Sequence, residues 1–505
     1  MPDLERLLRD ARPAWPEPSP AAEGRARAAL GFGPAPRSPR GWLSRTARGR
    51  AARLLIPAAL LLTAGAAVAA TLISTGSSGA PAGRAASLDF GPPETVGGPV
   101  SAFDGRPAVA VDGRGVVTVA WGRAGRIVMS SRPPGGRWSA AERVSDPARR
   151  AAYPQVGADR AGNVTVTWRE RTAGERFTQR FTLPSGAPAG YLTMLTGERW
   201  AVVARTRAAG GAWAGPQRLS DETAAVRDME VPGLAVAPGG RAAVTWDAGG
   251  AMWSRVRPPG GDWSPAARVG GDGGEAVDPQ LTGSPSGGAI LAWSNRIAAG
   301  GDRRYAIHAA ILDPDGTWGE AAVVDDRAEN PPHATGALGS HGDAVVAWIS
   351  ESADRTTTSA AVRSEGGTWG SPAAVSTSDR LFGLSGAPAV EGDGSAIVLS
   401  GPRGVAAIRP PGGVWRPLAL SPLAGRSFGF GALTDAAGNV VVVRGATTPP
   451  GIVLERADGT GGPVRVGGGA VAPAVAAGED GTTVVAWPAL GRTSQVLAVV
   501  AAPPR

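Results

Sequence analysis

The sequence predicts an all-β protein folded as an eight-bladed β-propeller, with one transmembrane helix ahead of it. Three observations carry this prediction. A strand ending in Val-Ala-Trp or a close variant recurs along the chain, a turn ending in Gly-x-Trp follows most copies, and a segment near the start of the repeats matches a piece missing at their end. Four short strands in each unit of about 40 to 55 residues are typical of a propeller blade.

The clearest unit runs from residue 107 to 146. Apolar residues recur at or near alternate positions along 108–121, on both sides of an Asp-Gly-Arg-Gly sequence at 112–115. This pattern indicates two strands joined by a hairpin turn. A third strand is expected at 126–130, and after a Pro-Pro-Gly-Gly break a fourth begins at Trp138 and ends near Val144.

Seven degraded copies of the second strand follow the first, which ends at Trp121. Their last residues are Trp168, Trp246, Trp293, Trp348, Ser400, Arg444 and Trp487. The turn before the fourth strand recurs at Trp138, Trp213, Trp263, Trp318, Trp369 and Trp415. Twelve of the 16 Trp residues therefore occupy two repeat positions, and we expect them to pack between blades.

The last copy has a third strand at 495–501 but no fourth strand after it. Residues 89–96 read like the fourth strand of the copy at 368–375, with Phe90 in the place of Trp369. We therefore expect this segment to complete the last blade, because closure removes the exposed sheet edges of an open array. The alternative is seven blades, which would require the copy at Arg444 not to form one.

Residues 1–53 form a basic tail. They hold 11 Arg against five Asp and Glu, which accounts for +6 of the net charge of +8. The rest of the chain is nearly balanced, so the charge argues against a nucleic-acid-binding main domain. Residues 3–30 contain two short helical patterns, and two readings are open: a tail without stable structure, or a docking motif for a cytoplasmic partner.

Residues 54–73 carry no charge over twenty positions, the length of a helix that spans a bilayer. Their Leu, Ile and Val residues contribute about −3 to −5 kcal/mol to membrane insertion. Four Arg residues lie just before this segment, so the positive-inside rule places the N-terminus in the cytoplasm and the following domain outside the membrane.

A cleaved signal peptide is the alternative to this anchor, because Ala67-Val68-Ala69 fits the cleavage pattern. Under both readings the C-terminal region is exported. A linker of small residues at 74–87 separates the hydrophobic segment from the propeller at 88–505.

The chain has no Cys, which excludes disulfides, thiolate metal sites and cysteine nucleophiles. Its three His residues fall at different places in the repeat: His308 on a third strand, His333 on a first strand and His341 in a hairpin turn. This scatter argues against a metal cluster. We expect neither a metal nor a cofactor.

The turn before each fourth strand resembles the Asp-box of sialidase-like (BNR-type) β-propellers. Asp313-Pro314-Asp315-Gly316-Thr317-Trp318 is the most similar copy, although the family pattern has a Ser or Thr two residues before the Asp and one more residue between Gly and Trp. The resemblance covers about 400 residues. It implies the blade topology, and it implies little about activity because this turn is structural in the family too.

Sialidase activity would imply three Arg holding the substrate carboxylate, a Tyr–Glu pair as nucleophile and an Asp as acid/base. The chain has only three Tyr, at 153, 191 and 305, and no arginine motif of the sialidase type near the first blade. These observations argue against a sialidase.

We expect ligand binding on the face formed by the loops between second and third strands and between blades, because their lengths vary. The largest insertion lies between Arg171 and Trp200. It is either an extra β-hairpin packed on its own blade or an aromatic lid for a ligand. The candidate ligand-binding residues are Arg149, Arg150, Tyr153, Phe177, Phe181, Tyr191, Trp200, Asp302, Arg303 and Arg304.

These features predict a single-pass membrane protein with an extracytoplasmic propeller that recognises a cell-surface glycan or protein without catalysis. A glycoside hydrolase of envelope sugars is one alternative, and an envelope sensor that signals through the cytoplasmic tail is another. Two carboxylates and a Tyr converging in the central pocket would favour the hydrolase.

Overall fold

The computed structural model describes residues 88–501 apart from short segments at 101–105, 183–187, 222, 225–230, 272–275, 298–303, 330–332, 352–354, 379–386, 401–404, 424–426, 436–437, 468–472 and 490–493. It describes only the backbone at 174–182, 188–198, 223–224, 329 and 427–428. The predicted tail, transmembrane helix and linker therefore lie outside the described residues. In the described part of the chain, no helix has the length and apolar character needed to cross a membrane.

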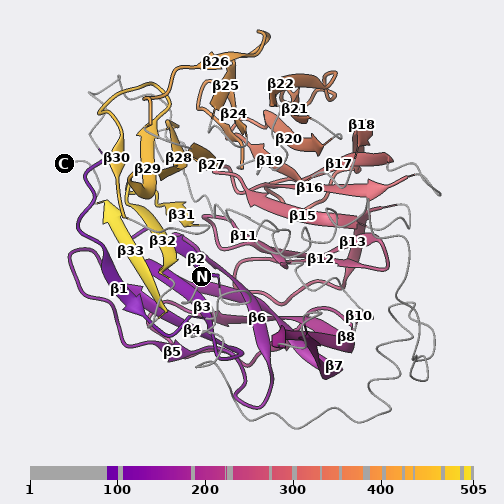
Figure 1. Cartoon of the computed structure of the whole chain (residues 1–505), viewed down its shortest axis with the longest axis vertical. Coiled ribbons are helices and arrows are strands. Elements are labelled where there is room, and N and C mark those ends of the chain that lie inside the picture. Colours follow the sequence, from indigo (N-terminus) through magenta and orange to yellow (C-terminus); the bar gives the residue numbers. More distant parts are fainter. Residues whose placement is uncertain are drawn as a thin grey trace, which may run out of the picture.

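The described residues form eight antiparallel sheets arranged as a propeller (Figure 1). The first four blades are built from β2 (Ala108–Val111), β3 (Val117–Arg123), β4 (Arg126–Arg132) and β5 (Glu142–Arg143); β6 (Ala151–Ala158), β7 (Val164–Thr182), β8 (Pro188–Arg207), β9 (Gln217–Arg218) and β10 (Thr223–Ala224); β11 (Gly233–Val236), β12 (Ala242–Ala248), β13 (Ala251–Arg257) and β14 (Ala267–Gly270); and β15 (Ala276–Gly283), β16 (Ala289–Arg296), β17 (Arg304–Leu312) and β18 (Ala322–Glu329).

Blades 5 to 8 follow the same plan. They are built from β19 (Ala334–Leu338), β20 (Ala344–Glu351), β21 (Thr356–Arg363) and β22 (Ala373–Ser378); β23 (Ala389–Val390), β24 (Ala396–Ser400), β25 (Val405–Arg409) and β26 (Arg416–Leu418); β27 (Ser427–Thr434), β28 (Val440–Thr447), β29 (Pro450–Arg456) and β30 (Val464–Arg465); and β31 (Ala474–Ala477), β32 (Thr483–Ala489) and β33 (Gln495–Ala501) with β1 (Glu94–Gly97).

The eighth blade confirms the predicted closure. Strand β1 pairs antiparallel with β33, with Glu94 opposite Ala498, and a bridge joins Phe90 to Ala501. In Figure 1 the indigo β1 accordingly lies beside the yellow β33. The N-terminal segment therefore supplies the outer strand that the last copy lacks, and the prediction of eight blades is confirmed.

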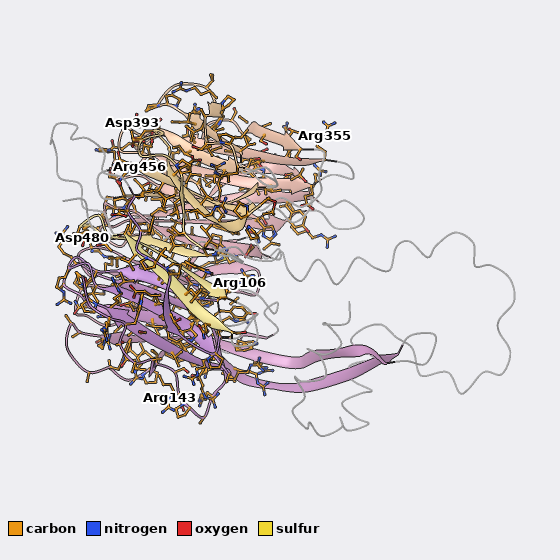
Figure 2. The ribbon with its side chains drawn as sticks, turned by 60° about the vertical axis from the view of Figure 1, so that its left-hand side comes forward. Arg106, Arg143, Arg355, Asp393, Arg456 and Asp480 are labelled. Carbon is orange, nitrogen blue, oxygen red and sulfur yellow. The ribbon has the colours of Figure 1, made fainter. Side chains whose placement is uncertain are left out.

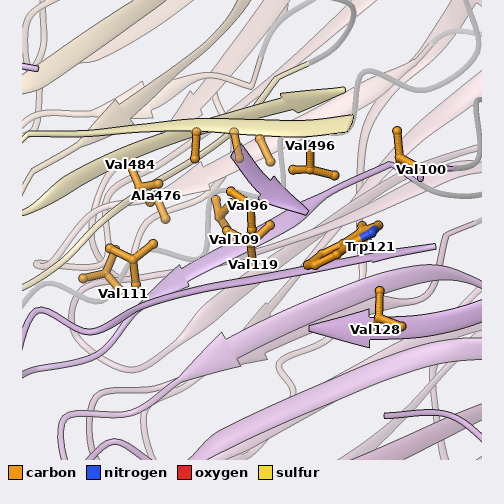
Figure 3. Packing of buried hydrophobic residues seen from close by; sticks show 14 residues of the cluster. Val96, Val100, Val109, Val111, Val119, Trp121, Val128, Ala476, Val484 and Val496 are labelled. Carbon is orange, nitrogen blue, oxygen red and sulfur yellow. The ribbon is translucent and has the colours of Figure 1, made fainter. Parts of the chain in front are cut away.

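Eight hydrophobic clusters among the described residues each join two neighbouring blades, and together they close the ring. Figure 3 shows the cluster between blades 8 and 1, where Val96 of β1 lies near Val109, Val119 and Trp121 of blade 1. Each sheet is buried on both faces, which explains why its inner strands are almost continuously apolar.

The second-strand Trp residues pack between blades, as predicted. Trp121 and Trp487 are fully buried. A Cβ added at Gly97, on the outer strand of the preceding blade, would lie 2.7 Å from the Trp121 ring, and one at Gly467 would lie 2.5 Å from the Trp487 ring. The glycines therefore make room for the indole of the next blade. The turn Trp residues are only partly buried, and the fourth strands begin after them: β5 begins at Glu142.

Blade 7 replaces the repeated Trp with a buried ion pair. Arg444 on β28 bonds Glu455 on β29, and both side chains are almost completely buried. Arg444 also donates to the carbonyl of Ser421 at 2.8 Å, and Glu455 accepts from the amide of the same residue at 3.0 Å. The two charges thus bind each other and the backbone, which offsets the cost of burying them in a core.

Candidate functional site

The first strands form the inner wall of the propeller. They contact one another in order from β2 to β6, β11, β15, β19, β23, β27 and β31, and β31 contacts β2. The chain enters each first strand from an inter-blade connection, so the upstream ends of these strands meet on one face. We call this end of the inner wall, where the upstream ends of the first strands meet, the channel mouth.

Four polar residues hold corresponding positions at the channel mouth. Arg106, Tyr153 and Asp278 each precede the proline of the repeat. His333 precedes Ala334, which stands opposite the repeat residue Trp348. Blades 1, 2, 4 and 5 therefore each contribute one polar side chain at this level of the inner wall.

Two of these residues have a strained backbone. Tyr153 has a φ of 56° and Asp278 a φ of 49°, in the left-handed region that residues other than glycine seldom occupy. In both strands the register shifts around the proline, between Ala152 and Gln155 and in the corresponding part of β15. Such bulges redirect side chains and are common beside binding sites. The strain thus marks the channel mouth as a functional candidate.

Asp278 and His333 form a pair across blades 4 and 5. His333 Nδ1 lies 2.5 Å from Asp278 Oδ2, and the side chains are 40% and 21% exposed. Gln280 Nε2 donates to the other carboxylate oxygen at 3.2 Å. Burial acts to lower the pKa of His333, but the hydrogen bond to Asp278 and the charges of Asp278 and Glu351 raise this pKa above its usual value.

Arg106 belongs to the same electrostatic group. Burial lowers the pKa of its guanidinium, and the charges of Tyr153 and Asp278 oppose that shift. An arginine in a protein stays protonated through such shifts. Arg106 therefore provides a fixed, half-buried positive charge beside the strained Tyr153 and Asp278.

A second group surrounds Arg169 on β7. Its guanidinium carbon lies 4.9 Å from the ring centre of Trp200 and 5.8 Å from that of Tyr153, distances at which cation–π attraction is significant. Next to it, Glu170 forms an ion pair with Arg149 at 3.4 Å, and burial raises the pKa of Glu170. Arg169 thus contacts both aromatic rings.

The structure brings together only some of the predicted site residues. Arg149, Tyr153 and Trp200 gather around Arg169 and Glu170.

Next to this group, the carbonyl of Arg150 accepts a hydrogen bond from the amide of Arg171 at 2.8 Å. The other predicted residues lie elsewhere. Arg304 is exposed at the start of β17, in blade 4, two blades further round the ring. Asp302 and Arg303 lie outside the described residues.

The predicted insertion is a long β-hairpin formed by the extensions of β7 and β8. The backbone register places Phe177 opposite Met194, Arg180 opposite Tyr191 and Phe181 opposite Gly190. Figure 2 shows the hairpin extending from the propeller on the side of Arg355, away from Asp393 and Asp480. Those two Asp residues lie in turns between first and second strands, so the insertion is on the predicted face, opposite the short turns.

Sequence reasoning missed Arg106, Arg169, Asp278 and His333. A signal was present in the residues before the repeated proline, which read Arg-Pro, Tyr-Pro and Asp-Pro in blades 1, 2 and 4. Gln155 and Gln280 follow two of these prolines, and both lie in the strands that contain a bulge, β6 and β15. Arg169 had no comparable signal, because its contacts join residues distant in the sequence.

The opposite face is built from interlocking turns. Arg160 in the β6–β7 turn pairs with Glu479 in the β31–β32 turn at 2.7 Å. Burial, together with the negative charges of Asp393 and Asp458, raises the pKa of Glu391 in the β23–β24 turn to about 7.

This turn face also holds a hollow of about 730 Å³ between blades 2 and 3, lined in part by Trp213 and Arg257. The hollow is far larger than the space of about 20 Å³ beside Arg169 and Trp200. We nevertheless place the candidate site at the channel mouth, because the backbone strain and the clustered titratable groups occur there. Among the described residues, no three His, Asp or Glu are grouped as metal ligands would be.

Comparison with known proteins leaves the family open. No protein-family model matches the chain, and no curated protein matches it either. Solved structures of low similarity include a puromycin hydrolase (16% identity, 69% of this chain and 51% of that chain, TM-score 0.41), the NanB sialidase from Streptococcus pneumoniae (10%, 58% and 64%, TM-score 0.33) and a streptogramin B lyase (12%, 74% and 100%, TM-score 0.35).

The chain spans about half the length of the puromycin hydrolase that it matches. Sialidases are among these structures of low similarity. With TM-scores below 0.5, the similarities give no ground for assigning an activity to this chain.

Proposed function

We propose that this chain is a membrane-anchored recognition protein whose extracytoplasmic propeller binds a cell-surface glycan at the channel mouth. The observation that carries the proposal is the convergence of Arg106, Tyr153, Asp278 and His333 at the upstream ends of four inner strands. Convergent polar groups beside an aromatic ring, on a rigid scaffold, are the usual composition of a ligand site.

A sugar ring matches this composition better than a peptide segment does. Its apolar face can lie on the Tyr153 ring, which also contacts Arg169. Its hydroxyl groups both donate and accept hydrogen bonds, so they can use the Arg106 donors, the Asp278 acceptors and the mixed capacity of His333. Arg106 adds a preference for a sugar that bears a carboxylate.

The hairpin of β7 and β8 extends from the same face as the mouth (Figure 2). The hairpin would contact the parts of a larger glycan that reach beyond the ring. Deleting residues 174–198 should therefore weaken binding of a long glycan while leaving the propeller folded, because this stretch extends beyond the blade core.

The anchor is part of the proposal. Residues 54–73 would span the membrane, with the basic tail 1–53 in the cytoplasm and the propeller outside. Protease added to intact cells should remove the propeller and leave an N-terminal fragment protected. A mature protein that begins near residue 70 would show a cleaved signal peptide instead.

Binding is tested with the full-length chain in detergent micelles on an array of cell-surface glycans, followed by calorimetric titration of the best ligand. Arg106→Ala and Tyr153→Asn should each weaken binding at least about tenfold, since each removes a contact of about 1.4 kcal/mol or more. Asn is chosen because it tolerates a positive φ. Arg114→Ala is the matched control, because Arg114 is 56% exposed in the β2–β3 turn on the opposite face.

Wild-type binding that both channel variants retain would contradict the assignment of the site. A glycoside hydrolase stays the second candidate, because Asp278, Glu351 and Tyr153 belong to the same electrostatic group at the mouth. Release of free sugar from the bound glycan would favour it over recognition alone.

A further inference from the structure

In the Asp278–His333 pair, His333 contacts the carboxylate through Nδ1, and its other ring nitrogen, Nε2, can act as a base. An ionised carboxylate only accepts hydrogen bonds, so His333 Nδ1 carries the proton that is donated to Asp278. In the neutral ring, Nε2 is then the basic nitrogen. The His333 side chain is 40% exposed. A ligand or a water molecule at the channel mouth can therefore reach this ring.

Asp278 is itself held in place from several directions. Gln280 binds its second carboxylate oxygen at 3.2 Å, and the bulge in β15 sets its backbone at a φ of 49°. A carboxylate fixed behind an imidazole is the arrangement that orients a histidine base and stabilises the imidazolium formed when it takes a proton.

We propose that the channel mouth hydrolyses an acyl ester carried by the bound carbohydrate, with His333 as the general base and Asp278 as its positioning residue. This inference rests on the proposed glycan site and adds an activity to it. The Arg106 guanidinium, in the same electrostatic group, supplies the positive charge for the oxyanion.

The reaction is a hydrolysis with water as the only co-substrate. His333 Nε2 takes a proton from water while the water oxygen bonds to the ester carbonyl carbon, and the carbonyl electron pair moves to its oxygen. The tetrahedral intermediate then collapses, the bond to the sugar oxygen breaks, and that oxygen receives the proton from His333. The products are a carboxylic acid and the free sugar hydroxyl, so atoms and electrons balance.

An ester fits this base better than a glycosidic bond does. Attack of water on a carbonyl needs one base that becomes the acid, which a single His can provide. Cleavage of a glycosidic bond uses two carboxyl groups on either side of the bond, whereas Asp278 is already engaged with His333 and Gln280.

The groups that act on His333 set the expected pH dependence. Asp278 binds it directly, and Glu351 at the end of β20 adds a negative charge from its own blade. Arg106 interacts with Asp278 from blade 1. Because the pKa of His333 is raised, the base is neutral only above that pKa, and the rate should increase with pH as the ring loses its proton.

The test measures deacetylation by the full-length chain in detergent micelles, with 4-nitrophenyl acetate and O-acetylated xylan as probes. His333→Gln should lower kcat/KM for the xylan probe about 100-fold, the scale of general-base catalysis. Asp278→Asn should lower it too and move the acid limb of the pH profile to lower pH, because the raised pKa of His333 then falls. His341→Gln, an exposed His in a turn of the opposite face, should change nothing.

Added imidazole should restore activity to His333→Ala, which a purely structural role would not permit. If the chain binds glycans at the mouth but deacetylates neither probe, the esterase inference is wrong and the recognition function stands. If the chain deacetylates the small probe through His333 but binds no glycan, the recognition function is wrong. Equal activity of the wild type, His333→Gln and Asp278→Asn would assign the hydrolysis elsewhere.

Discussion

Closure of the ring depends on one short N-terminal strand, and Val96→Asp tests it. Val96 is 5% exposed, in the cluster between blades 8 and 1. Losing the buried valine removes about 2 kcal/mol of hydrophobic stabilisation. A carboxyl group at the same place adds at least about 2 kcal/mol of desolvation cost. We expect the free energy of unfolding to fall by about 4 kcal/mol.

The matched control is Thr95→Asp, since Thr95 is the exposed neighbour on the same strand. Unfolding entropy is about 2.1 cal/mol/K per residue, so a domain of roughly 400 residues should lose about 5 °C in Tm with Val96→Asp and little with the control. Thermal melts of the full-length chain followed by tryptophan fluorescence measure both. Equal melting of Val96→Asp and wild type, or equal loss in both variants, would show that β1 does not close the ring.

Three further outcomes follow from the fold. Trp487→Ala should cost about 3 to 5 kcal/mol in chemical denaturation, because the ring is fully buried, whereas Trp263→Ala in a partly buried turn should cost clearly less. Glu455→Leu leaves the Arg444 charge buried without its partner and should cost about 3 to 5 kcal/mol, most of which the double change with Arg444→Leu should restore. The pKa of Glu391 is about 7 in the fold, above its usual 4.5, so the folded state holds the extra proton. Stability should therefore fall as pH rises from about 4.5 to 7, and melts of Glu391→Gln should lack this fall.

The architecture could be predicted from the sequence because the same strand and turn pattern occurs many times along the chain. Trp at the end of a second strand packs against the preceding blade wherever it occurs, so blade number and ring closure follow from counting copies. The insertion was predictable as well, since the 45-residue spacing between Trp168 and Trp213 stands out against 17 in two other blades. Its placement opposite the short turns follows from the meander alone.

The channel mouth could not be read from the sequence with the same ease. Asp278 and His333 are 55 positions apart, and only the ring brings them to 2.5 Å. Arg106 precedes the repeated proline, a position that other residues fill in other repeat units. Only the folded structure shows that its charge interacts with Tyr153 and Asp278. The aromatic residues of the insertion led to the prediction of a site at the hairpin instead. The backbone strain at Tyr153 and Asp278 is a matter of their φ angles, which the sequence does not give.

The most direct test of the central claim is a crystal structure of the propeller with its best glycan ligand bound. The account predicts electron density for the sugar at the channel mouth, within contact of Arg106, Tyr153 and His333. Sugar density in the hollow between blades 2 and 3 on the opposite face, beside Trp213, with an empty channel mouth, would contradict it.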